Sequence, residues 1–391
     1  IPHLIHSNRR MIDFTKATIT SHPGEEQQGM TLLQNSTTAF NAIISGYTRE
    51  YPNGKIILWD GTYNNTKNMV HHHYHSSLPS SFLSSSTTSN NGIIEIPFQA
   101  KYLHRLSTIT LENNAIDVFL EAFDSELSKQ PRTYWENSLL VLDHITSDTA
   151  IHVPIEAIAK HAKDQWGMLV AVDGAHGLLS QNLDMTQLSP FVDFYVSNGH
   201  KWLSCPRGVA MMYCPREDLR DTILRVPPVV SHGINDGYVS RFLWDGCRDY
   251  ASELSLPVVL DYWNQIEGGP QGVRTHLRKK LTKGVEVLAR LWHDENGDGS
   301  DTTGDITLVP MELHPPTMAM VRLPELRGDP LQISTDTDAK HIQERLFSES
   351  IEVPIKCING VLYARVSCHL YNTMDDFERL GHAIKKIYKL K

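Results

Sequence analysis

The sequence predicts an α/β protein with a mainly parallel β-sheet flanked by helices and a smaller α/β domain at the C-terminal end. The first observation is that short apolar segments typical of buried strands alternate with helical ones. These strand segments lie at 55–60, 138–145, 167–175, 193–199 and 209–214. The second observation is an amphipathic segment at 154–165, whose length suits the crossover helix that two parallel strands require. We therefore expect parallel β-α-β units in the larger part of the chain.

A change of pattern near residue 260 predicts the domain division. Residues 257–292 form a long helical stretch with apolar periodicity, and strands mixed with helices follow it to the C-terminus. We expect a large domain at 1–262 and a small domain at 263–391, with the option that the first residues of the chain also belong to the small domain. The Ser- and Thr-rich segment 75–92 is too polar to pack and is predicted to be a surface insertion.

Composition narrows the class of partner. The chain has 391 residues, 40% of them hydrophobic, which is enough for a large core. A formal net charge of −9 without a block of lysines and arginines argues against nucleic acid or an anionic membrane surface. No apolar run approaches the roughly 20 residues that span a bilayer. We expect a small-molecule partner and, from five irregularly spaced cysteines, a cytoplasmic protein with reduced thiols.

Polar residues stand where three of the predicted strands end, at 60–63, 144–147 and 173–176. Ligands bind at the carboxyl ends of strands in open parallel sheets, so we expect these residues to converge. Asp173 could simply cap the next helix. A carboxylate in an apolar cleft is costly unless a cation faces it, and Lys201 follows the next predicted strand.

Lys201 lies in the stretch "VSNGHKWLSCPRG" at 196–208, directly after a buried strand. It could be a solvated loop residue or an amine held for covalent chemistry. Ser36 and Thr37 open a predicted helix whose N-terminus favours an anion, although they could also be an ordinary cap. An acid, a lysine that can form a Schiff base and an anion site are together the components of a pyridoxal phosphate (PLP) site.

Four segments resemble one known family: "NSTTA", "VDGAHG", "SNGHKWLSCPRG" and "LYARVSCHLYNTMDDFERL". They are similar to the class V aminotransferase family of fold-type I PLP enzymes, especially the branch with isopenicillin N epimerases and hercynylcysteine sulfoxide lyases. The resemblance runs in consistent order from about residue 30 to the C-terminus. It implies a fold-type I PLP-dependent transferase fold.

The resemblance also implies roles for individual residues. Lys201 would form the Schiff base, Asp173 would meet the pyridine nitrogen, and His176 would act beside the 3′-oxygen. The other implied cofactor contacts are Ser147 near the same oxygen, Tyr63 stacked on the ring, and Ser36, Thr37, Asn198 and His200 at the phosphate.

Two further positions imply the substrate and the assembly. Arg365 matches the arginine that binds a substrate α-carboxylate, which implies an amino-acid substrate. The segment 242–250 resembles one that reaches the cofactor phosphate from the other subunit of a homodimer. Cys247 stands there in place of the usual threonine, and a thiol is a weaker hydrogen-bond partner than a hydroxyl.

The expected activity is that of a PLP-dependent carbon–sulfur lyase acting by β-elimination on a cysteine derivative or its sulfoxide, similar to hercynylcysteine sulfoxide lyase or cysteine desulfhydrase. The alternative is an epimerase of the isopenicillin N type, which needs a second base such as Tyr63 or a histidine. A catalytically degenerate PLP-fold binding protein is a third option. The presence of Lys201, Asp173 and Arg365 together argues against it.

We expect no metal site. The histidines of "VHHHYH" at 70–75 do not share a helix face, and no cysteine or carboxylate completes a tetrahedral set. The segment 294–305 has the spacing of a calcium loop, but a strand is predicted at 306–313 where a second helix would stand. Cys357 is predicted to be a buried, inert thiol within a strand rather than the nucleophile of a desulfurase.

Overall fold

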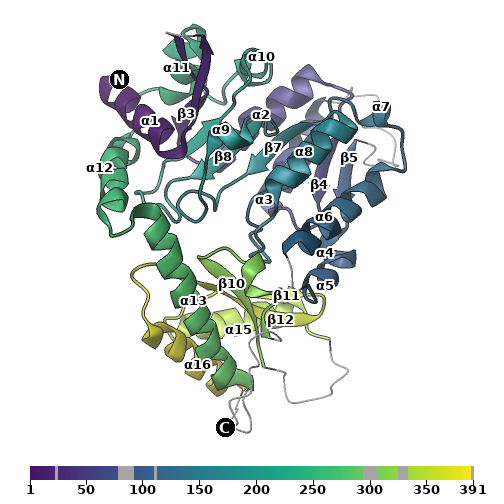
Figure 1. Ribbon diagram of the computed structural model, residues 1–391, viewed down its shortest axis with the longest axis vertical. Coiled ribbons are helices and arrows are strands. Elements are labelled where there is room, and N and C mark those ends of the chain that lie inside the picture. Colours follow the sequence, from purple (N-terminus) through teal and green to yellow (C-terminus); the bar gives the residue numbers. More distant parts are fainter. Residues whose placement is uncertain (23–24, 78–91, 110–111, 294–305, 325–332, 389–391) are drawn as a thin grey trace.

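The computed structural model describes residues 1–22, 25–77, 92–109, 112–293, 306–324 and 333–388. A seven-stranded sheet forms the centre of the larger part, and a three-stranded sheet lies in the C-terminal part (Figure 1). The calcium-like segment 294–305 lies outside the described residues, as does nearly all of the insertion predicted at 75–92.

The large sheet is mainly parallel, as predicted. Its strands, in spatial order, are β3 (Met30–Leu33), β9 (Ala210–Tyr213), β8 (Phe194–Asn198), β7 (Leu169–Asp173), β6 (Leu139–Asp143), β4 (Ile56–Trp59) and β5 (Ile93–Ile96). The five strands from β8 to β5 run parallel, and β9 and β3 add two antiparallel pairings at one edge. The carboxyl ends of β6, β7 and β8 therefore meet at one edge of the sheet.

Helices cover both faces of this sheet, which explains why its strands are apolar on both sides. In β4, Ile56 and Leu58 point into one core and Ile57 and Trp59 into the other. The first core is covered by α2 (Ser36–Glu50), α3 (Asn64–Ser77), α10 (Glu217–Asp221), η1 (Ile223–Arg225) and α11 (Gly237–Leu243). The second is covered by α5 (Leu103–Leu106), α6 (Glu112–Leu127), α8 (Ile155–Trp166) and α9 (Met185–Leu188).

The remaining elements of the larger part lie around this frame. Helix α1 (Pro2–Thr15) packs along α12 (Ala251–Gln265). The short elements are the hairpin β1 (Thr18–His22) and β2 (Glu25–Gln28), α4 (Phe98–Lys101), α7 (Arg132–Trp135) and η2 (His232–Asn235). Among the described residues, no helix has the length and apolar character needed to cross a membrane.

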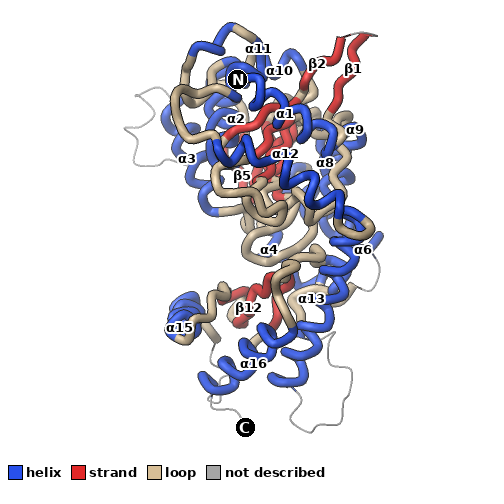
Figure 2. The backbone as a smooth tube through the Cα atoms, turned by 90° about the vertical axis from the view of Figure 1, so that its left-hand side faces the viewer, coloured by secondary structure: helices blue, strands red, loops and turns tan. Residues whose placement is uncertain are grey.

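Helix α13 (Gly269–His293) runs from the large sheet to the C-terminal part (Figures 1 and 2). The antiparallel sheet there has the order β10 (Met318–Arg322), β12 (Val361–Ser367), β11 (Ile355–Ile358), and it packs with α15 (Asp336–Ser348) and α16 (Met374–Tyr388). The strand predicted at 306–313 is wrong. Thr307 makes only an isolated bridge to Val321, and Met311–Leu313 is a 3-10 turn (η3). Pro310 lacks the N–H that a continuing ladder would need.

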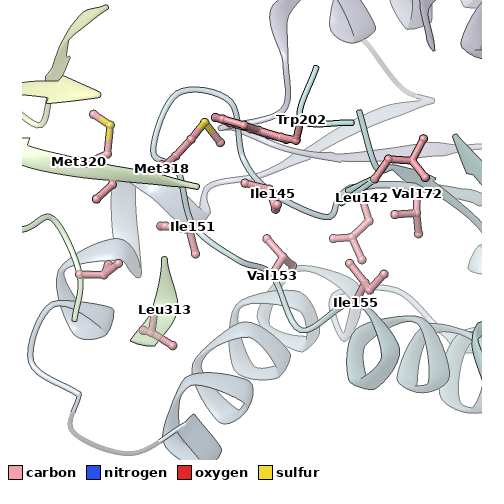
Figure 3. Packing of buried hydrophobic residues seen from close by; sticks show 14 of the residues in the cluster. Leu142, Ile145, Ile151, Val153, Ile155, Val172, Trp202, Leu313, Met318 and Met320 are labelled. Carbon is pink, nitrogen blue, oxygen red and sulfur yellow. The ribbon is translucent and has the colours of Figure 1, made fainter. Parts of the chain in front are cut away.

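One apolar cluster joins the two parts of the molecule. Ile151, Val153 and Trp202 from the larger part belong to the same cluster as Met318 and Met320 of β10 (Figure 3). Because close-packed interiors resist sliding, this cluster holds β12 in a fixed position relative to the ends of the parallel strands.

Candidate active site

The polar residues at the strand ends converge on one pocket. Seven of the residues singled out in the sequence line it: Ser36, Thr37, Tyr63, Ser147, Asp173, His176 and Lys201. The remaining wall consists of Phe40, Asn65, Thr66, Met69, Asp143, Ile145 and Ala175. Asn198, His200, Cys247 and Arg365 do not line it, although Asn198 and Arg365 are bonded to residues that do.

Lys201 is not a solvated surface charge. It lies in the loop after β8, is mostly buried, and its Nζ is 3.1 Å from Nε2 of His176. Burial lowers the pKa of the Lys201 amine, the Asp173 carboxylate opposes that shift, and the Arg365 charge reinforces it. A lysine with a lowered pKa is a better nucleophile at neutral pH than an exposed one.

Asp173 ends β7 and is 6% exposed. The Ala175 N–H donates to its Oδ1 at 3.0 Å, and the Thr66 hydroxyl of α3 lies 3.4 Å from Oδ2. Burial raises the pKa of Asp173, and the Ala175 amide and the Lys201 charge oppose this rise. The next helix begins only at Met185, so Asp173 does not cap a helix.

The sequence interpretation missed a second buried acid, Asp143. It ends β6 and pairs in register with Asp173 on the neighbouring strand. Burial raises the pKa of Asp143 well above its usual range, the Asp173 charge adds to the rise, and the Thr62 hydroxyl opposes it. Two carboxylates in a dry site rarely ionise together, and of this pair Asp143 holds its proton more firmly than Asp173 does. Its position at the end of a buried strand was the same signal that identified Asp173.

The turn from β3 into α2 forms a candidate anion site. Asn35 is the N-cap, and its side chain accepts from the Thr38 N–H at 2.9 Å. Asn198 holds Ser36 through two bonds of 3.0 Å, one to the Ser36 amide and one to its hydroxyl. Asn65 of α3, also missed by the sequence, donates to the Thr37 hydroxyl at 3.1 Å.

His200 forms its hydrogen bond away from this turn. Its Nδ1 is 3.2 Å from the Val209 carbonyl, and the ring is absent from the pocket wall.

Arg365 of β12 contacts the pocket wall through Ser147. Its Nη1 donates to the Ser147 carbonyl and lies 3.2 Å from the Ser147 hydroxyl. Its buried Nε finds no partner among the described residues. Burial lowers the pKa of Arg365, and the Asp148 carboxylate opposes that change. The guanidinium thus keeps a free edge, which suits a bidentate carboxylate.

The thiols lie outside the pocket wall. Cys247 is exposed, and within its segment Asp245 accepts a 2.9 Å bond from Gln34. Cys357 lies on β11 as predicted but is only half-buried, so the expectation of full burial is wrong. Burial raises its pKa, and its Sγ lies 3.2 Å from the Ser334 carbonyl. In the described part of the chain, no cluster of His, Cys, Asp or Glu could hold a metal ion.

The fold is that of the fold-type I PLP-dependent enzymes. A family model described as "Aminotransferase class-V" matches residues 108–231 of the chain. Both statements confirm the expectations from the sequence.

Named relatives agree with this family. An L-cysteine desulfhydrase of Arabidopsis thaliana is 29% identical over 267 residues, which cover 64% of this chain and 54% of the relative. An isopenicillin N epimerase of Amycolatopsis lactamdurans is 28% identical over 277 residues, covering 66% of this chain and 61% of the relative. The chain thus spans about half the length of the first desulfhydrases it matches.

Two solved structures share the fold over nearly the whole chain. A cysteine desulfurase from Thermococcus onnurineus NA1, in its apo form, has a TM-score of 0.65 at 17% identity and covers 99% of this chain and 84% of its own. A cystine C–S lyase in complex with cysteine persulfide has a TM-score of 0.64 at 17% identity, covering 98% of this chain and 86% of its own.

The buried acid pair predicts that Asp143→Asn gains stability relative to wild type as pH rises. Because the folded-state pKa of Asp143 is raised, the native state holds a proton that the unfolded state releases above about pH 4. The stability of the wild type therefore falls as pH rises from 4 toward the raised pKa of Asp143. The Asp143→Asn variant does not lose stability in this way, because its amide does not titrate. We expect the variant to gain up to about 1.4 kcal/mol on wild type for each pH unit in that window.

Thermal unfolding of the cofactor-free chain between pH 5 and pH 8 checks this prediction. Asp338→Asn is the control: hydrogen bonds from Thr335 lower the pKa of Asp338, so its effect on stability changes with pH only below about pH 4, and its difference from wild type should stay constant between pH 5 and pH 8. A difference between Asp143→Asn and wild type that shrinks with rising pH would contradict the raised pKa of Asp143.

Proposed function

We propose that this chain binds PLP in the pocket at the strand ends and catalyses carbon–sulfur bond cleavage by β-elimination on a cysteine derivative or its sulfoxide. The observation that supports the proposal most strongly is the buried Lys201 amine, which shares a pocket with Asp173 and lies close to Arg365. The names of the relatives support the same chemistry, because they include L-cysteine desulfhydrases. They also include the epimerases that fit the alternative outcome.

The residues present fit the cofactor. A buried carboxylate at the end of β7 would pair with the protonated ring nitrogen, and the start of α2 would bind the phosphate with Ser36 and Thr37. Asn198 would act on the phosphate indirectly, by orienting Ser36. Tyr63 lines the pocket and is 46% exposed, so its ring is free to stack on a ligand.

When bound, PLP withdraws electrons from the bonds at the substrate α-carbon. Arg365 would hold the α-carboxylate through its free edge, which leaves the β-substituent pointing into the cleft. Lys201 would then take the α-proton as a base, and the bond to the β-sulfur would break with its electron pair going to sulfur. The proposed products are the sulfur leaving group, pyruvate and ammonia, the last two after addition of water.

The cofactor assignment predicts the phenotype of Lys201→Ala. The variant should lose the visible absorbance that PLP shows when joined to a lysine, and its activity, while its circular dichroism stays that of wild type. One buried amine adds little to a core of this size, so the fold should persist. Unchanged visible absorbance would show that PLP is attached elsewhere. The exposed Lys340 provides the matched control, and Lys340→Ala should keep the absorbance.

The substrate assignment predicts pyruvate from cysteine S-conjugates or their sulfoxides, one molecule for each molecule consumed. Arg365→Lys should mainly raise KM, by on the order of tenfold or more, because an ammonium cannot reproduce a bidentate fork. The experiment incubates the holoenzyme with a panel of conjugates in deuterated water and follows both pyruvate and α-deuterium. Deuterated product of inverted configuration without pyruvate would reject the lyase and support the epimerase.

We also propose a homodimer whose interface continues from the segment 242–250 onto α12. Leu254, Val258 and Tyr262 stand four residues apart on that helix and are 44%, 71% and 55% exposed. This spacing places the three side chains on one face of the helix as an apolar stripe. The helix follows the segment of Cys247 in the chain. Such a stripe supports a protein contact. The reduced cysteines support a cytoplasmic location, which cell fractionation would test.

The dimer predicts that Val258→Asp dissociates the chain, since an interfacial charge without a partner is costly. Sedimentation at micromolar concentration should give a dimer for wild type and a monomer for Val258→Asp. Phe347→Asp is the matched control, because Phe347 is 67% exposed on α15, away from the stripe. A wild-type monomer that holds active PLP would exclude the homodimer.

A further inference from the structure

His176 is held between two nitrogen groups. The indole Nε1–H of Trp202 donates to Nδ1 of His176 at 3.2 Å. On the other side of the same ring, Nε2 lies 3.1 Å from Nζ of Lys201. Trp202 directly follows Lys201 in the chain and is 8% exposed. One buried indole thus contacts the imidazole that contacts the lysine.

The two contacts determine where the protons lie. An indole N–H can only donate, so Nδ1 of His176 must accept and carries no proton. Burial holds the pKa of His176 well below its usual range, and the charge of Arg365 adds to this effect. The ring is therefore neutral at neutral pH, and its single proton lies on Nε2. Because Nε2–H donates, Lys201 accepts through its lone pair and is an uncharged amine.

We propose that Trp202 is a positioning residue that fixes the Nε2–H form of His176 and thereby presents Lys201 as a free amine. The inference concerns the site of the proposed function, but it does not depend on which reaction occurs there. In the holoenzyme the same Nε2–H would be a donor directed into the cofactor pocket.

The charged groups around Lys201 have opposing effects on its protonation, so the position of the His176 proton matters. Asp173 and Asp143 favour the ammonium form of Lys201, while burial and Arg365 favour the amine. If His176 carried its proton on Nδ1, its Nε2 would accept from the ammonium and would reinforce the two acids. The donor from Trp202 excludes that form, so His176 acts together with burial and Arg365.

Trp202 is itself held by the C-terminal part of the chain. The His369 ring stacks on the indole at 6.2 Å with an interplanar angle of 8°, and its Nε2 donates to the Trp202 carbonyl at 3.0 Å. His369 accepts at Nδ1 from the Leu370 amide, and Lys280 binds the His369 carbonyl at 3.2 Å. The segment that follows the strand of Arg365 therefore orients the indole.

The test measures the protonation of Lys201 without any cofactor. The chain, freed of PLP, is labelled with acetic anhydride across a range of pH, and mass spectrometry compares Lys201 with the exposed Lys340. Only an uncharged amine reacts: its lone pair forms the amide bond, acetate leaves, and the amine proton goes to solvent. Trp202→Phe should move the labelling midpoint of Lys201 to higher pH. Its labelling at pH 7 should fall on the order of tenfold, the equivalent of one pKa unit.

Trp263→Phe is the matched control. The Trp263 indole also donates to the lysine loop, at 2.8 Å to the Leu203 carbonyl, and its ring also contacts His369. Trp263→Phe should leave the labelling midpoint of Lys201 unchanged. An equal shift from both variants, or no shift from Trp202→Phe, would overturn the proposal. In a His176→Phe background Trp202→Phe should add no further shift, and a full shift there would overturn it as well.

An independent measurement needs no Trp202 variant. Nitrogen NMR of the chain with labelled histidine, in which His176 is assigned by the signals lost in His176→Phe, should show the ring proton on Nε2. A proton on Nδ1 would overturn the proposal. Because neither experiment uses PLP, failure here would leave the cofactor test of Lys201→Ala unaffected, so the two ideas fail separately.

Discussion

The burial of the Lys201 amine is the constraint on which the rest of the site depends. Removing an amine from water is costly, and the cost is tolerated only if the group is uncharged or is faced by opposite charge. Here the neighbours oppose one another. Two carboxylates at the ends of β6 and β7 attract the charged form, while Arg365 and the apolar surroundings oppose it. Small changes at His176 can therefore decide the state of the lysine, which is the property that a nucleophile and proton carrier requires.

That electrostatic balance requires two parts of the chain to stay in register. Lys201 and the acids lie at the ends of the parallel strands, whereas Arg365 belongs to the antiparallel C-terminal sheet. The apolar cluster that joins Trp202 with Met318 and Met320 fixes their separation. The ion pair of Lys356 with Asp148, at 2.6 Å, adds a second connection next to Arg365. The ion pair is partly exposed, so the apolar cluster contributes more to this register than the pair does.

The fold and the Lys201 and Asp173 part of the site could be predicted from the sequence, because local patterns indicate both. The apolar strands of a sheet that is covered on both faces, and a crossover helix, can be recognised in the sequence. Lys201 and Asp173 directly follow such strands. Asp143 was missed, although it ends a strand, because its importance comes from the cross-strand register with Asp173. Thr66 and Asn65 follow Tyr63 in a polar segment, but they were missed because which of its side chains face the pocket depends on how α3 is placed. From the sequence alone, Trp202 would be taken for an ordinary core residue, because its role depends on the direction of its N–H.

The pocket wall also favours one route of sulfur removal over another. A desulfurase needs a cysteine thiolate that attacks the substrate sulfur, and a thiol suits that task only when its pKa is low. No cysteine is among the residues that line this pocket, and all five cysteines of the chain are in its described part. Burial raises the pKa of Cys205, the thiol nearest in sequence to Lys201, to about 12. Burial also raises the pKa of the half-buried Cys357, which lies on a strand. For the proposed function, the absence of a cysteine from the pocket wall favours departure of the sulfur group with its own electron pair over attack by Cys205 or Cys357.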